Sequence, residues 1–491
     1  MEIERRFLLR PCRVERLLRE RRIAYEAWPV EQFYLSADAK GSERYRRMGD
    51  RYIHTVKRGR GLVREEREEE VDAGLYARKK EEHRGGLVEK TRYVFALEGI
   101  TCELDVFKGS LKGLNILEVE FSSVEAAEGY GLPELFRPLL VAEVTENSAF
   151  TNGALSRTLR IPAIEESLEG LLGRLEERRE WLKASVKVGF GPYESGRHAL
   201  QLILASLLRT VRANADAIRE GDEESERLHQ LRVAMRKMRV LLGEFRGLFD
   251  AGWVGDHRER LRELMRSTNN LRDLQVHRQE LERYREMLPR RERSVLDRLA
   301  EHLDREIARQ REALVELLGS QVFRKEMGIL ERFASTERAE GFVPVADGPV
   351  ILAAKERLKR RFKELRREGK RLGKKSPPEA YHRLRIGVKK LRYLIESFDS
   401  ILGEEEQGEI LSRLKGLQTL LGEHQDRRIQ SETLERLARS EEIGDKASRQ
   451  ALLELAERLE KEAAEYREAF PERFAPVAGS RKLLHRAICG F

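Results

Sequence analysis

The hydrophobic periodicity of this 491-residue chain changes once, near Ile161 and Pro162. Before this point, apolar and polar residues alternate with period two in short segments, which predicts a mostly antiparallel β domain. From Glu165 onward the period is that of long amphipathic helices broken at glycine and proline clusters. We therefore expect a multidomain α+β protein, with a β domain over 1–160, a connecting helix and linker over 161–189, and an all-α domain over 190–491.

Eight segments of the N-terminal region carry the strand pattern, and two segments between them carry a helical one. The strands are expected over 1–9, 32–36, 44–48, 52–58, 63–71, 87–97, 100–108 and 115–123, and the helices over 11–24 and 72–80. In the C-terminal region we expect helix breaks at 189–191, 221–222, 289, 341–349 and 376–378.

Charged residues in the expected strands recur at positions i and i+2, which places both members of each pair on one strand face. The charged faces carry Glu2, Glu4 and Arg6; Arg44 and Arg46; Lys57; Lys90 and Arg92; Glu103 and Asp105; and Glu118 and Glu120. The strand from Arg64 to Glu70 is charged on both faces. Such faces cannot enter an apolar core unless their charges are paired or bind a ligand. We therefore predict a β tunnel or barrel with a charged lumen.

The expected lumen residues fall into two chemical classes. Glu2, Glu4, Glu118 and Glu120 are hard oxygen donors in pairs, which suits Mg²⁺ or Mn²⁺. The basic residues bind phosphate or carboxylate groups, and the arginines can do so with two hydrogen bonds. Acidic and basic pairs in one cavity predict a site for a metal-chelated oligophosphate.

A pattern of one histidine and three cations occurs twice in the helical region. It comprises His229, Arg232, Arg236 and Arg239 in the first copy, and His382, Arg385, Lys389 and Arg392 in the second. The spacing i, i+3, i+7, i+10 predicts one stripe along a helix, while the apolar residues between them pack elsewhere. An aspartate, Asp273 or Asp426, follows at the same distance in both copies and is expected to orient the cations or cap a helix. A repeat of this size predicts two helical units related by a pseudo-two-fold axis.

The β region resembles the CYTH family of triphosphate tunnel metalloenzymes over residues 1–160. The matching motifs lie at Glu2–Arg6, Arg44–Arg46, Thr55–Lys57, Arg64–Glu68, Glu89–Tyr93, Glu103–Phe107, Glu118–Glu120 and Glu143–Thr145. The resemblance implies metal-dependent hydrolysis of inorganic triphosphate in the tunnel. Arg6 stands where the family usually has a lysine, so the charge is kept on a planar group that does not deprotonate.

The CYTH resemblance also implies a role for each motif residue. The metal ligands would be Glu2, Glu4, Glu118 and Glu120, and the triphosphate would be bound by Arg6, Arg44, Arg46, Lys57, Arg64, Lys90 and Arg92. Glu66, Glu68 and Lys57 are the catalytic candidates, with the two glutamates orienting water or pairing with lumen cations. Spacing alone does not identify a general base.

The helical region resembles the CHAD family, the conserved-histidine α-helical domain, over residues 190–490. The resemblance implies two pseudo-symmetric helical bundles and a surface that binds inorganic polyphosphate. The binding residues would be the eight members of the two stripes, His229, Arg232, Arg236, Arg239, His382, Arg385, Lys389 and Arg392, with Lys237 and Lys390 beside the same groove.

The composition bears on how anions are recognised and on the cellular compartment, and it does not change this interpretation. Charged residues make up 37% of the chain but the net charge is only +9, so anion recognition depends on where the cations lie. Three cysteines without pairable spacing favour a reducing compartment, and no apolar run approaches the ~20 residues that span a bilayer. We expect a cytoplasmic protein, with polyphosphate granules as a candidate location and no membrane partner.

Three alternatives stay open at this point. The chain could be a non-catalytic protein of polyphosphate granules, since only the metal ligands distinguish that function. It could act on an organic triphosphate, as a thiamine triphosphatase or a class IV-like adenylate cyclase. Nucleic-acid binding is disfavoured, because the stripes lack the interleaved aromatic residues of a single-strand binder. The sequence does not indicate an oligomeric state.

Overall fold

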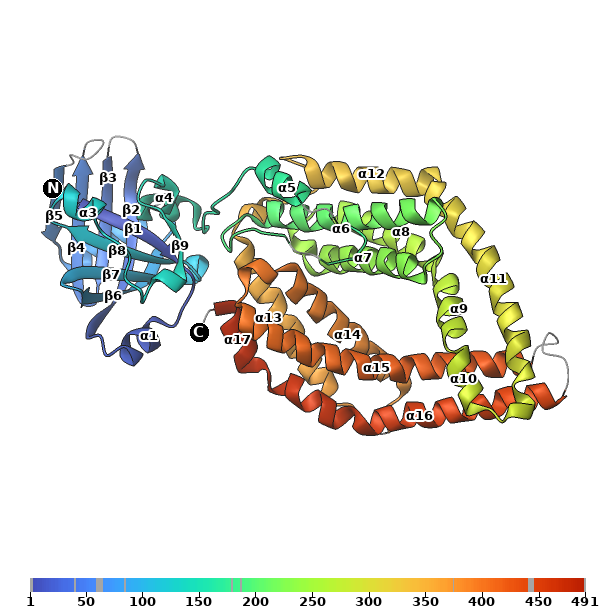
Figure 1. The fold of residues 1–491 in the computed structure, drawn as a ribbon. Helices are drawn as coiled ribbons and strands as arrows, with labels where there is room; N and C mark the ends of the chain where they lie inside the picture. Colours follow the sequence, from blue (N-terminus) through green and yellow to red (C-terminus); the bar gives the residue numbers. More distant parts are fainter. Residues whose placement is uncertain are drawn as a thin grey trace.

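The computed structural model describes residues 3–38, 41–58, 65–83, 85–177, 180–185, 188–373, 375–439 and 446–489. It consists of a β domain followed by a larger helical domain, as the periodicity predicted (Figure 1). Among the described residues, no helix has the length and apolar character needed to cross a membrane.

The β domain is one nine-stranded antiparallel sheet in the order β5-β4-β3-β2-β6-β7-β8-β1-β9. The strands are β1 Ile3–Leu9, β2 Tyr25–Asp38, β3 Gly41–Met48, β4 Arg51–Arg58, β5 Glu65–Glu70, β6 Val88–Leu97, β7 Ile100–Phe107, β8 Asn115–Phe121 and β9 Leu140–Glu143. Strands β6 to β8 cross β2 to β4 at a wide angle, so the sheet is strongly curved (Figure 1). Within the described ranges, β5 and β9 are its edges, and hydrogen bonds do not close the expected barrel.

All eight expected strands are present, and two features differ from the prediction. Strand β2 begins at Tyr25, well before the expected Gln32, because Pro29 interrupted the strand pattern there. The proline is tolerated because the β2–β3 ladder begins only at the next residue, Val30 opposite Met48. Strand β9 was not predicted, since four residues are too few to show a period. The expected helices are α1 Val14–Glu20 and α2 Ala73–Glu82.

One face of the sheet is apolar and carries the core of the β domain. Phe7, Leu104 and Leu117 are buried there with Leu18 of α1 and Phe136 of the segment that precedes β9. Directly opposed residues on neighbouring strands share a face, and Leu117 is opposite both Phe7 and Leu104. The charged residues at alternate positions of the same strands therefore lie on the other face.

The helical domain is built from two similar units. Its helices are α5 Leu168–Glu176, α6 Gly196–Arg219, α7 Ser225–Glu244, α8 Ala251–Arg266, α9 Asn269–Gln279, α10 Leu281–Met287, α11 Ser294–Gly319, α12 Gln321–Ser335, α13 Val350–Gly369, α14 Pro378–Ser397, α15 Glu404–Ala438, α16 Lys446–Gly479 and α17 Arg481–Cys489, with the short α3 Val124–Glu128 and α4 Asn152–Thr158 in the β domain. The expected breaks fall between helices, except that Pro378, the last residue of the break over 376–378, is the first residue of α14. Helices α7 and α14 are both 20 residues long and stand at the offset that separates His229 from His382. The predicted internal repeat is therefore structural.

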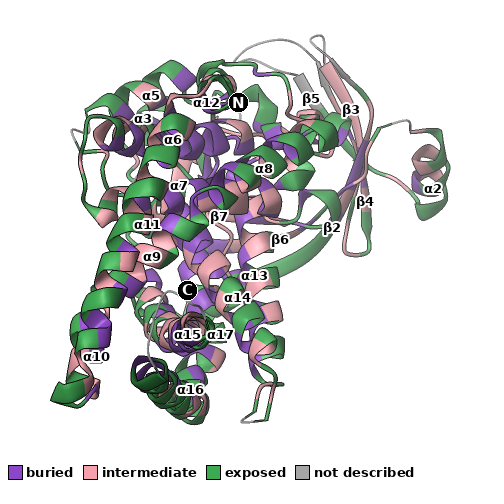
Figure 2. Cartoon of the chain, turned by 90° about the vertical axis from the view of Figure 1, so that its right-hand side faces the viewer, coloured by how far each residue is buried: buried purple, intermediate pink, exposed green. Residues whose placement is uncertain are grey.

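The two units differ after their repeated helices. In the second unit α15 continues for 35 residues, whereas the first unit breaks at Ser267 and Thr268 into α8 and α9. Buried positions line the facing sides of the helices of both units, while much of α16 is exposed (Figure 2). The break frees backbone carbonyl groups at the end of α8, which matters for the site below.

The two domains share one hydrophobic cluster. Leu8 and Ile116 of the sheet are buried in the same cluster as residues of α6 and α13. The Tyr193 hydroxyl, before α6, donates to the carbonyl oxygens of Leu9 at 3.4 Å and Gly113 at 3.2 Å. Gly113 has φ +115°, and a Cβ there would lie 2.9 Å from Leu352 Cδ2 of α13. The sheet is thus packed directly against the helical domain.

Candidate active site and anion pocket

The strand register places the predicted charged residues on one face of the sheet. Glu120 is opposite Glu4 and Glu118 is opposite Arg6, while Arg92 is opposite Asp105. Arg44 is opposite Thr55, which is opposite Glu68. Since directly opposed residues share a face, these side chains form one charged face. Its described members are Glu4, Arg6, Arg44, Arg46, Thr55, Glu68, Lys90, Arg92, Glu103, Asp105, Glu118 and Glu120.

Arg92 organises one part of the charged face. Its guanidinium donates to Asp105 at 2.8 and 2.7 Å and to Glu118 at 2.7 Å, and it also contacts Glu103. Lys90 is fully buried and bonds Asp105 as well. Although burial acts in the opposite direction, Lys90 and Arg92 lower the pKa of Asp105 to about 2. This part of the face is an internally paired network in which Asp105 is ionised at neutral pH.

A second part of the face surrounds Glu68. Its carboxylate accepts hydrogen bonds from Thr55 Oγ1 at 2.8 Å, Arg46 at 3.3 Å and Arg44 at 3.5 Å. Burial, followed by the neighbouring Arg44, lowers the pKa of Arg46. Two arginines therefore share one carboxylate, which leaves positive charge on this part of the face.

Three arginines of the charged face have unsatisfied donors. The Nε atoms of Arg6, Arg44 and Arg46 are buried and have no hydrogen-bond partner among the described residues. Arg6 Nε lies 3.6 Å from Glu4 Oε1, and its Nη2 donates to the carbonyl oxygen of Thr145 at 2.6 Å. An unpaired buried donor costs about 1–3 kcal/mol, so three on one face indicate where an anion would bind.

The carboxylates of the charged face suit a hard divalent cation. Glu4 and Glu120 are direct cross-strand partners, whereas Glu118 is held by Arg92. In the part of the chain that the structure describes, no three His, Cys, Asp or Glu side chains are grouped as a metal site. Mg²⁺ commonly uses only one or two carboxylates and completes its shell with water and substrate phosphates. The Glu4 and Glu120 pair therefore fits the expected Mg²⁺ or Mn²⁺.

Four of the predicted residues cannot be placed in full. Glu2 and Arg64 lie outside the described residues, as do the side chains of Lys57 and Glu66. The backbone of Lys57 in β4 is opposite that of Glu66 in β5, in register with the charged face. Their roles stay predictions.

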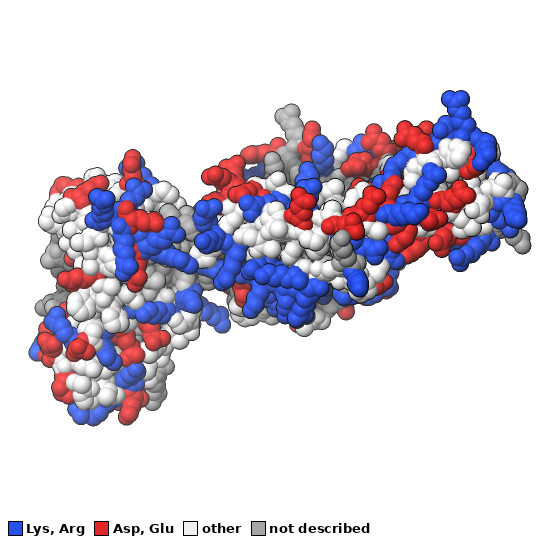
Figure 3. Space-filling model, turned by 90° about the horizontal axis from the view of Figure 1, so that it is seen from below, with Lys and Arg blue, Asp and Glu red and all other residues white. Residues whose placement is uncertain are grey.

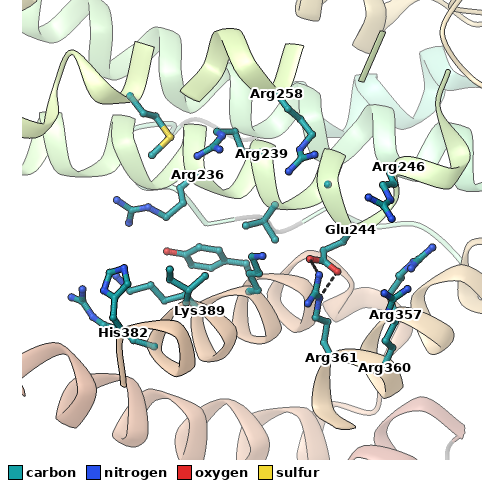
Figure 4. Close-up of a pocket in the computed structure, with 17 residues that line it drawn as sticks. Arg236, Arg239, Glu244, Arg246, Arg258, Arg357, Arg360, Arg361, His382 and Lys389 are labelled. Atoms are coloured by element: carbon teal, nitrogen blue, oxygen red, sulfur yellow. Dashed lines mark hydrogen bonds and ion pairs between the residues drawn. The ribbon is translucent and has the colours of Figure 1, made fainter. Parts of the chain in front are cut away.

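A cavity of about 630 Å³ lies between the repeated helices α7 and α14 and is bounded by α8 and α13 (Figure 4). Eight arginines and two lysines line it, with Glu244 as the one carboxylate in its lining. This anion pocket is lined by Arg236, Arg239, Val240, Gly243, Glu244, Arg246, Arg258, Met265, Arg357, Arg360, Arg361, His382, Arg385, Ile386, Lys389, Lys390 and Tyr393. Of the predicted binding residues, the structure brings together Arg236, Arg239, His382, Arg385, Lys389 and Lys390.

The cations of the anion pocket are incompletely paired. The Nε atoms of Arg239, Arg258 and Arg385 are buried and lack a hydrogen-bond partner within the described residues. Burial, followed by Arg385 and Arg236, lowers the pKa of Lys389 to about 7. Burial and the neighbouring arginines disfavour the charged form of Lys389, and a bound anion would stabilise that charged form.

Five lining arginines lie outside the repeated stripes and were not predicted from the sequence: Arg246, Arg258, Arg357, Arg360 and Arg361. Arg258 lies against α7, where a Cβ on Gly243 would be 3.1 Å from its Cζ, Nε and Nη2 atoms. Arg361 bonds Glu244. These residues belong to other helices and do not share the repeated spacing, so only the fold brings them to the pocket.

Other predicted binding residues have partners inside the protein. Arg232 is buried and donates to Met265 O at 3.1 Å, to Asn269 Oδ1 at 2.8 Å and to Thr268, at the break between α8 and α9. Lys237 is also buried, 2.8 Å from Glu396 and 2.7 Å from the carbonyl of Ala184. The first stripe is therefore interrupted at Arg232, which bonds to the helix break, and Lys237, expected beside the groove, is held in the helix packing.

Two further stripe residues, Arg392 and His229, and the repeated aspartate Asp426 are not among the residues that line the pocket. Arg392 pairs with Glu396 at 3.0 Å, and His229 is half-buried, with its pKa lowered by burial and by Arg272. Asp426 is 3.4 Å from Arg385, which agrees with the expected orienting role. Among the apolar residues of the stripes, Ile386 is an exception, because it is 41% exposed and lines the pocket.

Comparisons with known proteins each match part of this chain. The CHAD domain family model matches residues 202–435. An inorganic triphosphatase of Nitrosomonas europaea is 36% identical over 160 residues, which cover 32% of this chain and 98% of that protein. An uncharacterized protein of Mycobacterium tuberculosis is 31% identical over 246 residues, or 46% of this chain and 41% of its own length. The crystal structure of the CHAD domain from the plant Ricinus communis covers 62% of this chain and 98% of that chain, with 22% identity and a TM-score of 0.52.

Proposed function

Because this chain belongs to the CYTH family of triphosphate tunnel proteins and carries a CHAD domain, we propose that it hydrolyses inorganic triphosphate on its charged sheet face and binds inorganic polyphosphate in its anion pocket. The observation that carries the first half is the strand register, which gathers paired carboxylates and unsatisfied arginines on one face. Neither class of residue alone would distinguish a hydrolase from a passive anion site.

The arginines with free donors would hold the substrate. Arg6, Arg44 and Arg46 each present a buried Nε that an oxygen of the triphosphate can accept from. Lys90 and Arg92 are already bonded to Asp105 and Glu118, so they would fix the shape and field of the face more than they grip phosphate. Phosphate binding by Arg6, Arg44 and Arg46 costs little desolvation free energy, because their Nε donors are already out of water.

The carboxylates would supply the chemistry together with a divalent cation. Glu4 and Glu120, with Glu2, would hold Mg²⁺ or Mn²⁺, which neutralises charge on the phosphoryl group and so favours attack by water. Glu68 lies on the same charged face, where Thr55 and two arginines hold its Oε1, and its Oε2, which has no hydrogen bond to another described residue, would orient that water. Catalysis would then rest on positioning and charge neutralisation.

The anion pocket would act as a binding site and not as a second catalytic site. Ten cations against one carboxylate leave a large excess of positive charge, and Figure 3 shows a dense patch of Lys and Arg side chains on one face of the helical domain beside the β domain. A long polyanion engages many such cations at once and releases counterions as it does so. Polyphosphate, which has one charge per unit and no bulky bases, matches a pocket lined mainly by arginine.

The test has two separate measurements on the purified full chain. Phosphate release is followed with Mg²⁺ or Mn²⁺ and with tripolyphosphate, ATP, thiamine triphosphate or long-chain polyphosphate as substrate. Binding of long-chain polyphosphate, duplex DNA and single-stranded RNA is titrated at matched salt. We expect tripolyphosphate to be the preferred substrate and polyphosphate to be the tightest ligand. Preferred turnover of an organic triphosphate, or RNA binding as tight as that of polyphosphate, would contradict the corresponding half of the proposal.

A further inference from the structure

Lys389 occupies an unusual position in the anion pocket. It comes from α14 and faces Arg236 of α7, while Arg385 and Arg392 lie on its own helix and Asp426 approaches from α15. His229 of α7 is also near enough to interact with it electrostatically. Figure 4 shows Lys389 and His382 on one wall of the pocket and Arg236 on the other. A primary amine thus sits within a cluster of phosphate-binding groups.

We propose that Lys389 is acylated by acyl phosphates, and that this modification switches off polyanion binding. The inference rests on the proposed anion binding of the pocket. An acyl phosphate carries its phosphate directly on the reactive carbonyl group. Arginines that bind the phosphate, Arg236 and Arg385 above all, would therefore hold the carbonyl carbon beside the amine. Holding two reactants together in this way raises the rate of their reaction.

The chemistry requires a neutral amine, and the pocket provides one. With its pKa lowered to about 7, a substantial fraction of Lys389 is uncharged at neutral pH. An ordinary lysine is neutral in roughly one molecule in a thousand under these conditions. The lone pair of Nζ attacks the carbonyl carbon and forms the C–N bond. The bond between the carbonyl carbon and the oxygen that bridges to phosphorus breaks. Inorganic phosphate leaves with the electron pair of that bond, and the nitrogen loses its proton to water.

Acylation would change the pocket in two ways. The amide is uncharged, so one of the central cations is lost. The acyl group also occupies space that a phosphate chain would fill, next to the exposed Ile386. Removing charge from the centre of a multivalent site should weaken binding more than removing it from the rim, because several contacts depend on the same path of the polyanion.

The other lysines near the pocket are less suited to the reaction. Lys237 is buried and bonded to Glu396 and to the carbonyl of Ala184, which leaves no path for a reagent. Lys390 lies on the Glu244 and Arg361 side of the pocket, where that carboxylate opposes an incoming anion. Lys325 is exposed on α12, outside the pocket, and serves as an internal reference for the general reactivity of lysine.

The experiment treats the full-length protein with acetyl phosphate and follows each lysine by peptide mass spectrometry. We expect Lys389 to be acetylated at least about tenfold faster than Lys325, a modest share of what proximity can supply. Saturating tripolyphosphate should slow the reaction at Lys389 and leave Lys325 unchanged. The uncharged acetyl N-hydroxysuccinimide ester should show a smaller preference for Lys389, because it has no phosphate for the arginines to hold. Equal rates at the two lysines, or no protection by tripolyphosphate, would overturn the inference.

Two variants test the consequence for binding. Lys389→Gln mimics the acylated side chain and should lower the affinity for long-chain polyphosphate severalfold. Lys389→Arg keeps the charge but lacks the amine that is acylated, so its own affinity for polyphosphate should be the same before and after acetyl phosphate treatment. Unchanged affinity in Lys389→Gln would overturn the switch. If the untreated protein does not bind polyphosphate, the proposed function of the pocket fails, and the switch fails with it. If it binds polyphosphate but Lys389 does not react selectively, only the acylation inference fails.

Discussion

The charged sheet face and the anion pocket both gather arginines, but they balance them in opposite ways. On the sheet, Arg92 alone meets three carboxylates, and Glu68 is shared by Arg44 and Arg46. In the pocket, one carboxylate faces ten cations. Paired charges of both signs can hold a metal ion and a phosphate together, which chemistry on phosphate requires. A one-sided excess of cations attracts a long anion strongly but offers nothing to hold a metal ion. The difference indicates catalysis at the first site and binding at the second.

The largest expected effect comes from the carboxylates of the sheet. Glu120→Gln removes one charge from the Glu4 and Glu120 pair and should lower metal-dependent tripolyphosphate hydrolysis by about 10²–10³-fold, the range for losing one electrostatic contact to a transition state. Phosphate release at saturating Mg²⁺ measures it. Polyphosphate binding in the pocket should not change, since the substitution lies in the other domain.

Glu89→Gln is the matched control for this prediction. Glu89 is exposed on strand β6, next to Lys90 but on the opposite face of the sheet, so its loss should leave turnover unchanged. Wild-type activity in Glu120→Gln would show that the paired carboxylates do not hold the metal.

The pocket should show the next largest effect. Replacing Arg236, Arg239 and Arg385 with alanine should weaken long-chain polyphosphate binding at least about tenfold and make it less sensitive to salt. Tripolyphosphate hydrolysis at the sheet should remain. A titration across several salt concentrations measures both changes.

The control for the pocket variant removes the same charge elsewhere. Arg290, Arg305 and Arg309 are exposed and lie outside the pocket, so their replacement by alanine removes the same charge and, beyond that, one exposed ion pair between Arg309 and Glu306. If this control weakened binding as much as the pocket variant, the bulk charge of the chain would explain the affinity, and the comparison between the two sites would lose its basis.

These contrasts also show what the sequence could predict. The i, i+2 spacing of Glu118 and Glu120 predicted that both lie on one face, because side chains alternate along a strand. The strand register then places Arg6 and Glu4 opposite them on that face. The period of a helix placed Arg236 and Lys389 correctly for the same reason. Arg232 has equally good spacing, yet it turns inward, because α8 ends at Arg266 and frees the carbonyl of Met265. A helix break of this kind depends on tertiary packing and leaves no periodic signal.

The pocket residues from other helices show a second limit. Arg258 and Arg357 are remote in sequence from both repeated stripes and do not share their spacing. Basic residues are frequent in this chain, with 95 Lys and Arg, so composition does not single these two out. Only the packing of α8 and α13 against α7 and α14 shows which arginines meet.

The repeat itself offers a third prediction, since Arg232 and Arg385 are equivalent residues with different surroundings. Arg232→Ala removes the guanidinium that donates to Asn269 Oδ1 and to the carbonyl of Met265, which keeps a hydrogen bond from Thr268 Oγ1 at 2.8 Å, so the loss at Asn269 should lower the free energy of unfolding by about 1–3 kcal/mol. Arg385→Ala loses a 3.4 Å ion pair with the partly exposed Asp426 and should cost less than about 1 kcal/mol.

The measurement for this pair is urea unfolding of the full chain, followed by the helical signal in circular dichroism. Polyphosphate binding should show the reverse order, with Arg385→Ala weaker than Arg232→Ala. Equal stability in both variants would mean that the break between α8 and α9 does not depend on Arg232.

The smallest expected effect is a pH dependence that belongs to the pocket and not to the sheet. In the free protein, burial and the neighbouring arginines lower the pKa of Lys389 to about 7, whereas a bound polyanion favours its charged form and raises that pKa. Binding therefore takes up a proton above pH 7, and polyphosphate affinity should fall severalfold as pH rises from about 7 to 9. In the free protein, the lowered pKa of Lys389 also reduces the free energy of unfolding below pH 7. This loss of stability disappears as the pH approaches 10.5, the ordinary pKa of lysine. Lys389→Arg, which stays charged, should bind with no such dependence in that range, while His229, whose pKa is lowered by burial, acts only at lower pH. Titrations of both proteins at constant ionic strength decide the matter, and a parallel pH dependence in Lys389→Arg would assign the effect to another group.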